Sequence, residues 1–241
     1  MSDVQDTVGT NRKRLQQKHR SGMSSVRKKN AGFLARTAGG EMETIRDIRM
    51  REFGFNWVKG QRWSEETDEI VNITRFERKM GFMSEDELWS YIREHSPDNV
   101  YLSVAYWTFP KNACTEGGFW NGADLFFDLD SDNLKHAYAD ACVIYDVLQD
   151  DFGMDDIEMI HSGCKGYHVV AYGWKDNEQR TRRLRELGAN ERAEIMDYFI
   201  GRYRCETIDE AVTRDVNRLR RVPGTKNSKC GKTSKIIKTT N

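Results

Sequence analysis

The chain has 241 residues, of which 38% are hydrophobic and 11% aromatic, and it carries 38 Lys and Arg against 38 Asp and Glu. This composition is sufficient for one folded core and excludes a wholly disordered protein. The longest apolar runs, such as 123–127 and 167–172, are much shorter than a membrane-spanning helix, and no apolar signal region follows Met1. We therefore predict an intracellular, cytoplasmic protein without a membrane segment.

The balanced total charge conceals an uneven distribution. Residues 1–40 hold nine Lys and Arg against two Asp, and residues 212–241 hold nine against one, so residues 41–211 carry a net charge of −15. Basic ends suit a polyanionic partner, and acidic residues in the body suit the metal ions that accompany phosphate chemistry. From charge alone, basic ends that merely keep the protein soluble explain the pattern equally well.

The five cysteines are odd in number, and no two of them are closer than 22 residues. Such spacing favours neither a disulfide framework nor a tetrahedral zinc site, and it indicates a reducing compartment. Residues 1–40 mix Lys, Arg, Gln, Ser and Gly with few large apolar side chains. They predict a disordered basic tail in front of a single domain over residues 41–241.

The first elements of this domain are strands and a capped helix. Residues 51–58 alternate large apolar with polar side chains, as a half-buried strand does, and residues 70–76 are its expected neighbour. Ser84 and Glu87 form a capping box at the start of a helix with Leu88, Tyr91 and Ile92 on its buried side. Residues 100–106 are a further predicted strand.

Later elements alternate between helix and strand. Apolar side chains recur at three- and four-residue spacing over 134–152 and again over 191–204, which predicts two helices. Residues 157–160 and 167–172 are predicted strands between them. The order is too irregular for a doubly wound parallel sheet, so the predicted fold class is α+β, with a mixed β-sheet flanked by helices.

A pair of aspartates lies in an apolar strand, 123–130. Because side chains two positions apart share a face of a strand, Leu125, Phe127 and Leu129 are expected on one face, with Asp128 and Asp130 on the other. Two carboxylates so close repel each other unless a cation lies between them, and hard oxygen ligands suit Mg²⁺ or Mn²⁺. The alternative is a strand that ends in a polar turn with both aspartates solvated.

Two further segments carry groups suited to phosphate. Residues 162–168 combine two glycines with Ser162, Lys165 and His168, which can donate hydrogen bonds to phosphate oxygens, although an ordinary glycine-containing hairpin is the alternative. Residues 212–229 place Asp215 among many cations, either as a salt-bridge partner or as a further metal ligand. Together the three segments supply carboxylates, a phosphate loop and basic clamps, as nucleotidyl transfer requires.

Five motifs in this order and spacing resemble the small catalytic subunit of archaeal and eukaryotic-type DNA primases. The first is the REF element, and the third is similar to that family's GADLVFDID metal strand. The motifs cover 51–55, 100–106, 122–130, 162–168 and 218–229. The resemblance implies a template-directed enzyme that makes short RNA primers on single-stranded DNA for replication, in a heterodimer with a large regulatory subunit.

The resemblance also assigns residues to roles. It implies that Asp128, Asp130 and Asp215 are catalytic and hold two Mg²⁺ or Mn²⁺ ions. It implies nucleotide contacts at Ser162, Gly163, Lys165, His168, Arg221, Asn227 and Lys229. Contacts to template or primer are expected at Arg51, Glu52, Arg75 and Arg218.

The sequence departs from the family pattern at three places. Between Asp130 and Phe152 only His136 and Cys142 could bind zinc, so the zinc-binding knob of relatives is expected to be absent. Cys164 replaces a basic or amide residue, and Asn227 replaces a common His. These departures bear on nucleotide affinity more than on the type of reaction.

Three other functions compete with the primase. A primase-polymerase or repair polymerase of the same superfamily would prefer dNTPs. A glycosyltransferase would use Asp128 and Asp130 for Mn²⁺, but it leaves Asp215 unexplained. A non-catalytic nucleic-acid-binding module would keep DNA affinity without metal binding.

Overall fold

The computed structural model describes residues 45–240, which belong to one unit over residues 41–241. The predicted basic tail over residues 1–40 lies outside the described residues. Three short 3₁₀ helices cover Ile48–Met50, Pro110–Asn112 and Glu116–Gly118. The α-helices are α2 (Glu85–His95), α3 (Leu134–Asp150), α4 (Glu178–Arg185), α5 (Ala189–Tyr203) and α6 (Glu210–Arg214). The strands are β1 (Phe53–Ser64), β2 (Glu69–Met80), β3 (Asn99–Ser103), β4 (Ala105–Trp107), β5 (Trp120–Ala123), β6 (Leu125–Asp130), β7 (Asp156–His161), β8 (Gly166–Gly173), β9 (Leu219–Arg221) and β10 (Lys235–Thr239).

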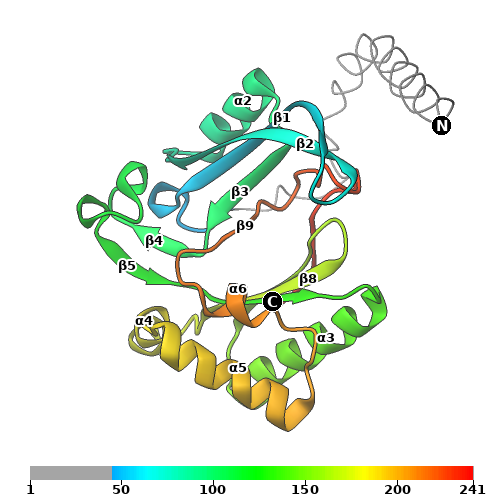
Figure 1. Cartoon of the computed structure of the whole chain (residues 1–241). Helices are drawn as coiled ribbons and strands as arrows, with labels where there is room; N and C mark the ends of the chain where they lie inside the picture. The colour runs from blue at the N-terminus through cyan, green and yellow to red at the C-terminus, as the bar shows by residue number, and fades with distance from the viewer. Residues whose placement is uncertain (1–44, 241) are drawn as a thin grey trace, which may run out of the picture. The chain divides into compact units, whose positions relative to one another are not determined.

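The described strands form two four-stranded sheets and one two-stranded sheet. The first sheet has the order β2-β1-β3-β9, the second has the order β10-β7-β8-β6, and β4 pairs with β5. Each of the seven strand pairs recorded among residues 45–240 is antiparallel. The α+β class is therefore confirmed, with several antiparallel sheets where the sequence suggested one mixed sheet (Figure 1).

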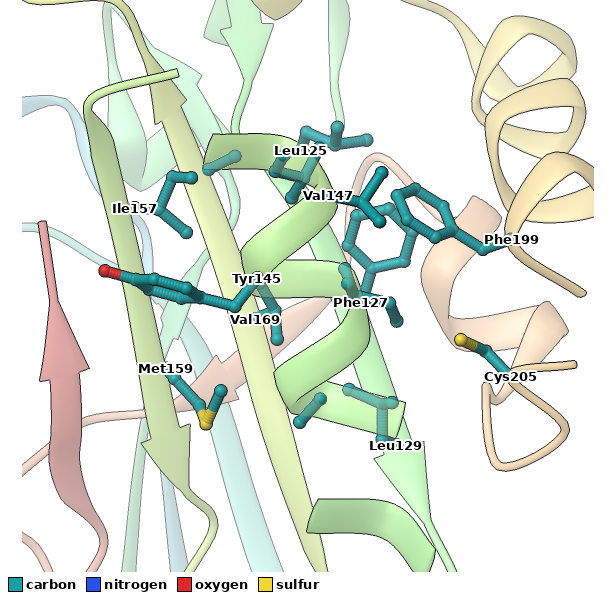
Figure 2. Packing of buried hydrophobic residues seen from close by; sticks show 14 of the residues in the cluster. Leu125, Phe127, Leu129, Tyr145, Val147, Ile157, Met159, Val169, Phe199 and Cys205 are labelled. Carbon is teal, nitrogen blue, oxygen red and sulfur yellow. The ribbon is translucent and has the colours of Figure 1, made fainter. Parts of the chain in front are cut away.

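The second sheet is built on the alternation predicted for β6. Leu125, Phe127 and Leu129 are 0–1% exposed and pack with α3 and α5 in the main apolar cluster. In Figure 2 the side chains of Phe127 and Phe199 lie beside each other between β6 and α5. This packing fixes the side chains of even-numbered β6 residues on the opposite face, where Phe126 joins a smaller cluster.

The first sheet is covered on one face by α2. Phe53 and Phe55 of β1 are fully buried and pack edge to face against Phe82, which precedes the helix. Ser84 accepts a hydrogen bond from the backbone N–H of Glu87, and the Glu87 carboxylate reaches back to the N–H of Met83. Ser84 is therefore confirmed as the N-cap of α2, whereas the second bond of the predicted capping box goes to Met83, one residue before the N-cap.

The predicted strand over 100–106 is divided between two sheets. Residues up to Ser103 form β3, which pairs with β1, whereas Ala105 begins β4, which pairs with β5. Ser103 uses its hydroxyl at the junction, donating to the Ala105 carbonyl at 2.6 Å and accepting from the Glu52 N–H at 3.0 Å. The chain thus passes from one sheet to the next without a loop.

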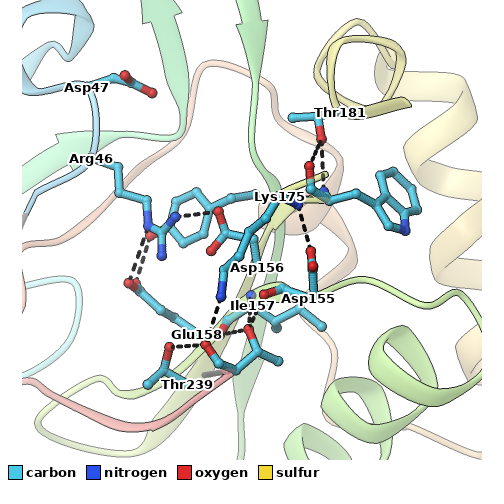
Figure 3. Close-up of polar contacts among 12 residues, drawn as sticks. Arg46, Asp47, Asp155, Asp156, Ile157, Glu158, Lys175, Thr181 and Thr239 are labelled. Atoms are coloured by element: carbon cyan, nitrogen blue, oxygen red, sulfur yellow. Dashed lines mark hydrogen bonds and ion pairs between the residues drawn. The ribbon is translucent and has the colours of Figure 1, made fainter. Parts of the chain in front are cut away.

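Polar contacts fix the end of β7 that lies farthest from Asp130. Arg46 pairs with Asp156 and lies 3.7 Å from Glu158 (Figure 3). The Lys175 N–H donates to the Asp155 carboxylate at 2.7 Å, and Thr240 donates to the Asp155 carbonyl at 2.8 Å. These contacts hold the ends of β7, β8 and β10 together, so the opposite end of the sheet has a rigid base.

The structure pairs two of the five cysteines, which the sequence analysis did not expect. Cys164 and Cys230 are joined in a disulfide with their Cα atoms 5.5 Å apart. Cys205 is buried, Cys142 is half-buried and Cys114 is exposed, and all three are free thiols. Among residues 45–240, no helix has the length and apolar character needed to cross a membrane.

Candidate active site

Asp128 lies directly opposite His168 on the neighbouring strand. The register of β6 and β8 pairs these two residues, and the Asp128 Oδ1 atom is 3.5 Å from the His168 Nε2 atom. Their side chains are 19% and 8% exposed. The pairing places a carboxylate and an imidazole together on the face of the sheet that α3 and α5 leave free.

The environment of this pair disfavours charge on both groups. Burial raises the pKa of Asp128 to about 7, with further contributions from the negative charges of Asp130 and Asp209. Burial and, to a smaller extent, the cations Arg220 and Arg221 lower the pKa of His168 to about 3. His168 is therefore neutral at neutral pH and offers no positive charge to the carboxylate beside it.

Asp130 lies at the end of β6 in close contact with Gly166. The two residues are register partners, and a Cβ atom on Gly166 would overlap the Asp130 carboxylate and the Leu129 carbonyl oxygen. The Asp130 N–H donates to the Thr207 carbonyl at 2.9 Å. Gly166 is thus needed for the close approach of β8 to Asp130, which is exposed.

The segment that leads into α6 is bonded along β6. The Asp209 N–H donates to the Asp128 carbonyl at 2.8 Å, and the Asp128 N–H donates to the Thr213 hydroxyl at 3.2 Å. Asp209 also caps α6, because its carboxylate accepts from the Val212 N–H at 3.0 Å. A third carboxylate therefore approaches Asp128 from a segment distant in sequence.

Asp215, the third carboxylate expected from the sequence, ends α6. It is exposed, and its carboxylate accepts a hydrogen bond from the Asn217 N–H at 2.9 Å. Its negative charge raises the pKa values of Arg78 and Cys114 as a minor contribution, behind those of Glu52 and of burial. The structure thus brings Asp128 and Asp130 together, and no three His, Cys, Asp or Glu side chains of residues 45–240 form a group that could hold a metal ion.

The expected phosphate loop, residues 162–166, connects β7 to β8 as a tight turn. The Ser162 hydroxyl accepts from the Gly166 N–H at 3.3 Å, and Gly163 has a φ of 86°. Lys165 is exposed and pairs with Asp132 at 2.7 Å, just beyond Asp130. The loop therefore presents its ammonium group on the same side as the aspartates, while glycine supplies the left-handed backbone.

The expected phosphate contacts on the other segment differ in accessibility. The half-buried Arg221 donates to the Asn99 carboxamide at 2.8 Å, and its guanidinium lies 5.0 Å from the centre of the Tyr101 ring. Asn227 is 7% exposed, and its side-chain oxygen accepts from the Lys229 N–H at 3.1 Å. Lys229 is exposed. Asn227 thus shapes the turn, while Lys229 is accessible to a ligand.

Two of the expected template contacts are buried. Arg51 is 1% exposed and forms an ion pair with Asp124 at 2.8 Å. Glu52 is 0% exposed and accepts two hydrogen bonds from Arg78, at 2.8 and 2.9 Å. Neither side chain can reach a nucleic acid strand, so the expected role at these two positions is corrected to a structural one.

The other two expected template contacts are accessible. Arg75 on β2 is 61% exposed and pairs with Glu77. Arg218 is exposed, and its charge lowers the pKa of Asp128, opposing the larger contributions of burial and the neighbouring carboxylates. Arg218 therefore lies near the aspartates, whereas Arg75 lies on the β1–β2 hairpin.

Two residues near the site were not identified from the sequence. Asp209 precedes a five-residue helix, so its only sequence signal was that of a helix cap. Arg220 is 5% exposed and donates to the Tyr172 hydroxyl at 3.0 Å, while its Nε and Nη1 atoms have no hydrogen-bond partner. Its alternation with Arg221 along β9 could have shown that the two guanidinium groups face opposite sides.

Comparisons with known proteins place this geometry in context. No family model matches the chain. The chain is 30% identical over 165 residues to the DNA primase small subunit of Methanospirillum hungatei, covering 64% of this chain and 38% of that protein. It is 33% identical over 171 residues to the DNA primase small subunit of Aeropyrum pernix, covering 66% of this chain and 43% of that protein.

The fold has a solved counterpart. The polymerase domain of ligase D from Mycobacterium tuberculosis, solved in complex with DNA, superposes with a TM-score of 0.51 at 14% identity. The match covers 79% of this chain and 74% of that domain.

The chain spans about two fifths of the length of the curated primase subunits that it matches. The five sequence motifs resemble the same kind of protein that the names of the curated relatives give. Over about two thirds of its length, this chain is similar to the DNA primase small subunit, as its sequence motifs indicated.

Proposed function

We propose that this chain is a DNA primase catalytic subunit that joins ribonucleotides on a single-stranded DNA template. The reaction is attack of a 3′-hydroxyl on the α-phosphorus of an incoming NTP, with pyrophosphate as the leaving group. Single-stranded DNA and NTPs are the proposed substrates, and a larger regulatory subunit is the proposed partner. The similarity to primase small subunits supports each of these assignments.

One observation of the structure carries the proposal. Asp128 and Asp130 lie at the end of β6, and no salt bridge among residues 45–240 joins Asp128 to a charged cation, since His168 is neutral beside it. Burial, together with the negative charges of Asp130 and Asp209, raises the pKa of Asp128 to about 7. A pair of carboxylates whose negative charge nearby cations offset only in part is suited to a divalent cation.

The donor set fits Mg²⁺ or Mn²⁺ better than zinc, because it consists of carboxylate oxygens. Asp128 and Asp130 would hold the metal. We also assign Asp215 to the proposed metal site. It ends α6, and two residues of the same segment, Asp209 and Thr213, are hydrogen-bonded to the backbone of Asp128. When bound, divalent ions lower the pKa of the attacking hydroxyl and stabilise the negative charge on the leaving pyrophosphate.

The residues of the chain itself would position the triphosphate. Lys165 and Lys229 are exposed cations on the two loops that the disulfide between Cys164 and Cys230 joins, and the exposed Arg218 adds a third. His168 is neutral and can donate one hydrogen bond without adding charge. Arg and Lys are suited to neutralising charge that develops on a leaving phosphate group.

The test is de novo synthesis on a single-stranded homopolymer with labelled NTP and Mg²⁺ or Mn²⁺. The assay is run with the chain alone and with the larger subunit added. We expect product from the wild type in at least one of these conditions, and none from Asp128→Asn in either. The matched control is Asp146→Asn, since Asp146 is an exposed carboxylate on α3 that pairs with Lys238. The control should retain full synthesis.

Substrate choice is tested in the same assay. Ribo- and deoxynucleotides are supplied separately, with and without an annealed primer. Synthesis from dNTPs only and only from a primer would replace the primase by a repair polymerase of the same superfamily. Equal synthesis by the wild type and Asp128→Asn would remove the catalytic assignment of this carboxylate.

A further inference from the structure

The disulfide joins the two segments that carry the proposed nucleotide contacts. Cys164 lies in the 162–166 loop between β7 and β8, and Cys230 lies in the 227–231 turn after β9, 66 positions later. Their Cα separation of 5.5 Å is typical of a disulfide. Ser162 and Lys165 belong to the first segment, and Lys229 belongs to the second.

The two segments are in close contact independently of the bond. A Cβ atom on Gly163 would lie 3.0 Å from the Lys232 carbonyl oxygen and 3.1 Å from the Ser234 nitrogen. The Ser234 hydroxyl donates to the His161 carbonyl at 3.1 Å. Because these contacts keep the two segments adjacent, the two thiols remain within reach of each other after reduction, although the separation of the loops is then no longer fixed by a covalent bond.

The turn around Cys230 is also ordered by its own hydrogen bonds. The Asn227 carbonyl accepts from the N–H groups of Cys230 at 3.3 Å and Gly231 at 2.7 Å. Cys230 is exposed and Cys164 is half-buried, so a small oxidant can reach the pair from the Cys230 side. The bond can therefore form and break without unfolding of either segment.

We propose that Cys164 and Cys230 form a reversible disulfide that holds the two loops at a fixed separation and raises their affinity for a nucleoside triphosphate. This inference rests on the proposed function, since it concerns the same triphosphate site. A loop that is already ordered loses less conformational entropy when a ligand binds. Reduction leaves the loops joined only by packing and hydrogen bonds, so their side chains are less well positioned.

The oxidation is a thiol–disulfide exchange with a low-molecular-weight disulfide such as oxidised glutathione. The Cys230 thiolate attacks one glutathione sulfur, forms a mixed disulfide and releases one glutathione thiolate. The Cys164 thiolate then attacks the Cys230 sulfur and releases the second glutathione thiolate. The two cysteines lose two protons and two electrons, and the oxidised glutathione gains the two electrons.

The test compares the protein equilibrated with oxidised glutathione and with dithiothreitol. Peptide mapping without reduction should find Cys164 and Cys230 in one linked peptide pair after oxidation. The oxidised form should unfold about 5 to 15 °C above the reduced form, because the bond closes a long loop. A non-hydrolysable NTP analogue with Mn²⁺ should bind the oxidised form roughly three- to tenfold more tightly.

Variants separate this pair from the other thiols. Cys164→Ser and Cys230→Ser should each remove the difference between the two redox conditions in both melting temperature and affinity. Cys142→Ser, which alters a free thiol on α3, should retain both differences. A linked peptide confined to other cysteines, or no linked peptide, would overturn the proposal.

The readouts also separate this inference from the proposed function. If the analogue binds both redox forms equally, the bond is a structural link only, and the regulatory proposal is wrong while the primase assignment stands. If the analogue binds neither form although the linked peptide and the melting shift are found, the nucleotide site itself is wrong and the regulatory proposal is lost with it.

Discussion

Two aspartates only four residues apart, Asp124 and Asp128, have opposite environments. Asp124 is fully buried, and it is matched by the Arg51 guanidinium at 2.8 Å and by the Tyr106 hydroxyl. Asp128 is 19% exposed and faces the neutral His168, and its pKa is raised by burial and, to a smaller extent, by Asp130 and Asp209. The more deeply buried carboxylate, Asp124, is therefore the one that has a cationic partner in the fold.

The difference separates a charge that the fold uses for stability from a charge that has no such partner. Arg51 also donates to the carbonyls of Ser103 and Val104 and stacks on Tyr106, so it joins the first sheet to β4. Asp128 has no equivalent partner among the described residues. We infer that Asp124 is structural and that Asp128 is functional.

The largest predicted effect is on stability at Asp124. Asp124→Ala would leave the Arg51 guanidinium buried without its partner, and we expect a loss of about 3 to 5 kcal/mol in the free energy of unfolding. Urea denaturation measures this loss. The double variant with Arg51→Met should lose less than the two single variants together, whereas strict additivity would contradict a direct interaction.

The next largest effect is predicted at Gly166, which allows β8 to approach the Asp130 carboxylate closely. Gly166→Ala would force β8 away from the Asp130 carboxylate, and we expect a loss of about 1 to 3 kcal/mol together with reduced primer synthesis. Gly60→Ala is the matched control, because a Cβ atom at Gly60 meets nothing within 4 Å. Equal effects of the two substitutions would show that the contact with Asp130 is unimportant.

The raised pKa of Asp128, caused by burial and by the neighbouring carboxylates, predicts a stabilising substitution. The folded-state pKa of about 7 lies above the ordinary value of 3.8, so the wild type loses stability as the pH rises from about 4 to about 7. In metal-free buffer at pH 8, Asp128→Asn should therefore be more stable by about 1 to 2 kcal/mol, less than the full shift implies because the side chain is partly exposed. Urea denaturation at several pH values should show this advantage disappearing below about pH 4; a variant less stable at pH 8 would contradict it.

The smallest effect concerns the exposed Arg75. Arg75→Gln should change the free energy of unfolding by less than about 0.5 kcal/mol, since the side chain is 61% exposed. If Arg75 contacts the DNA backbone, the affinity for a labelled single strand should fall a few-fold at low salt, with a shallower salt dependence. Unchanged affinity and salt dependence would remove Arg75 from the template contacts.

The sequence predicted local patterns well and distant packing poorly. The alternation of β6 and the N-cap at Ser84 depend on neighbouring residues, and both were predicted correctly. The burial of Arg51 and Glu52 depends on Asp124 and Arg78, at distant positions in the chain, so their charged side chains were wrongly expected on the surface. The same limit explains why Asp209 was missed.

The cysteines are a second example of distant packing that the sequence did not predict. Spacing and an odd count are statistical signals, and they carry no information on which two loops meet. The pairing of Cys164 with Cys230 follows from the packing of the loop after β7 against the turn after β9. Such a contact is visible only once both sheets are in place.

The most direct test of the central claim is titration of Mn²⁺ into the metal-free protein by calorimetry. The wild type and Asp146→Asn should bind the ion, and Asp128→Asn should show binding weakened by at least about tenfold, which corresponds to 1.4 kcal/mol. Equal Mn²⁺ affinity in the wild type and Asp128→Asn would contradict the claim that the carboxylates of β6 hold the metal.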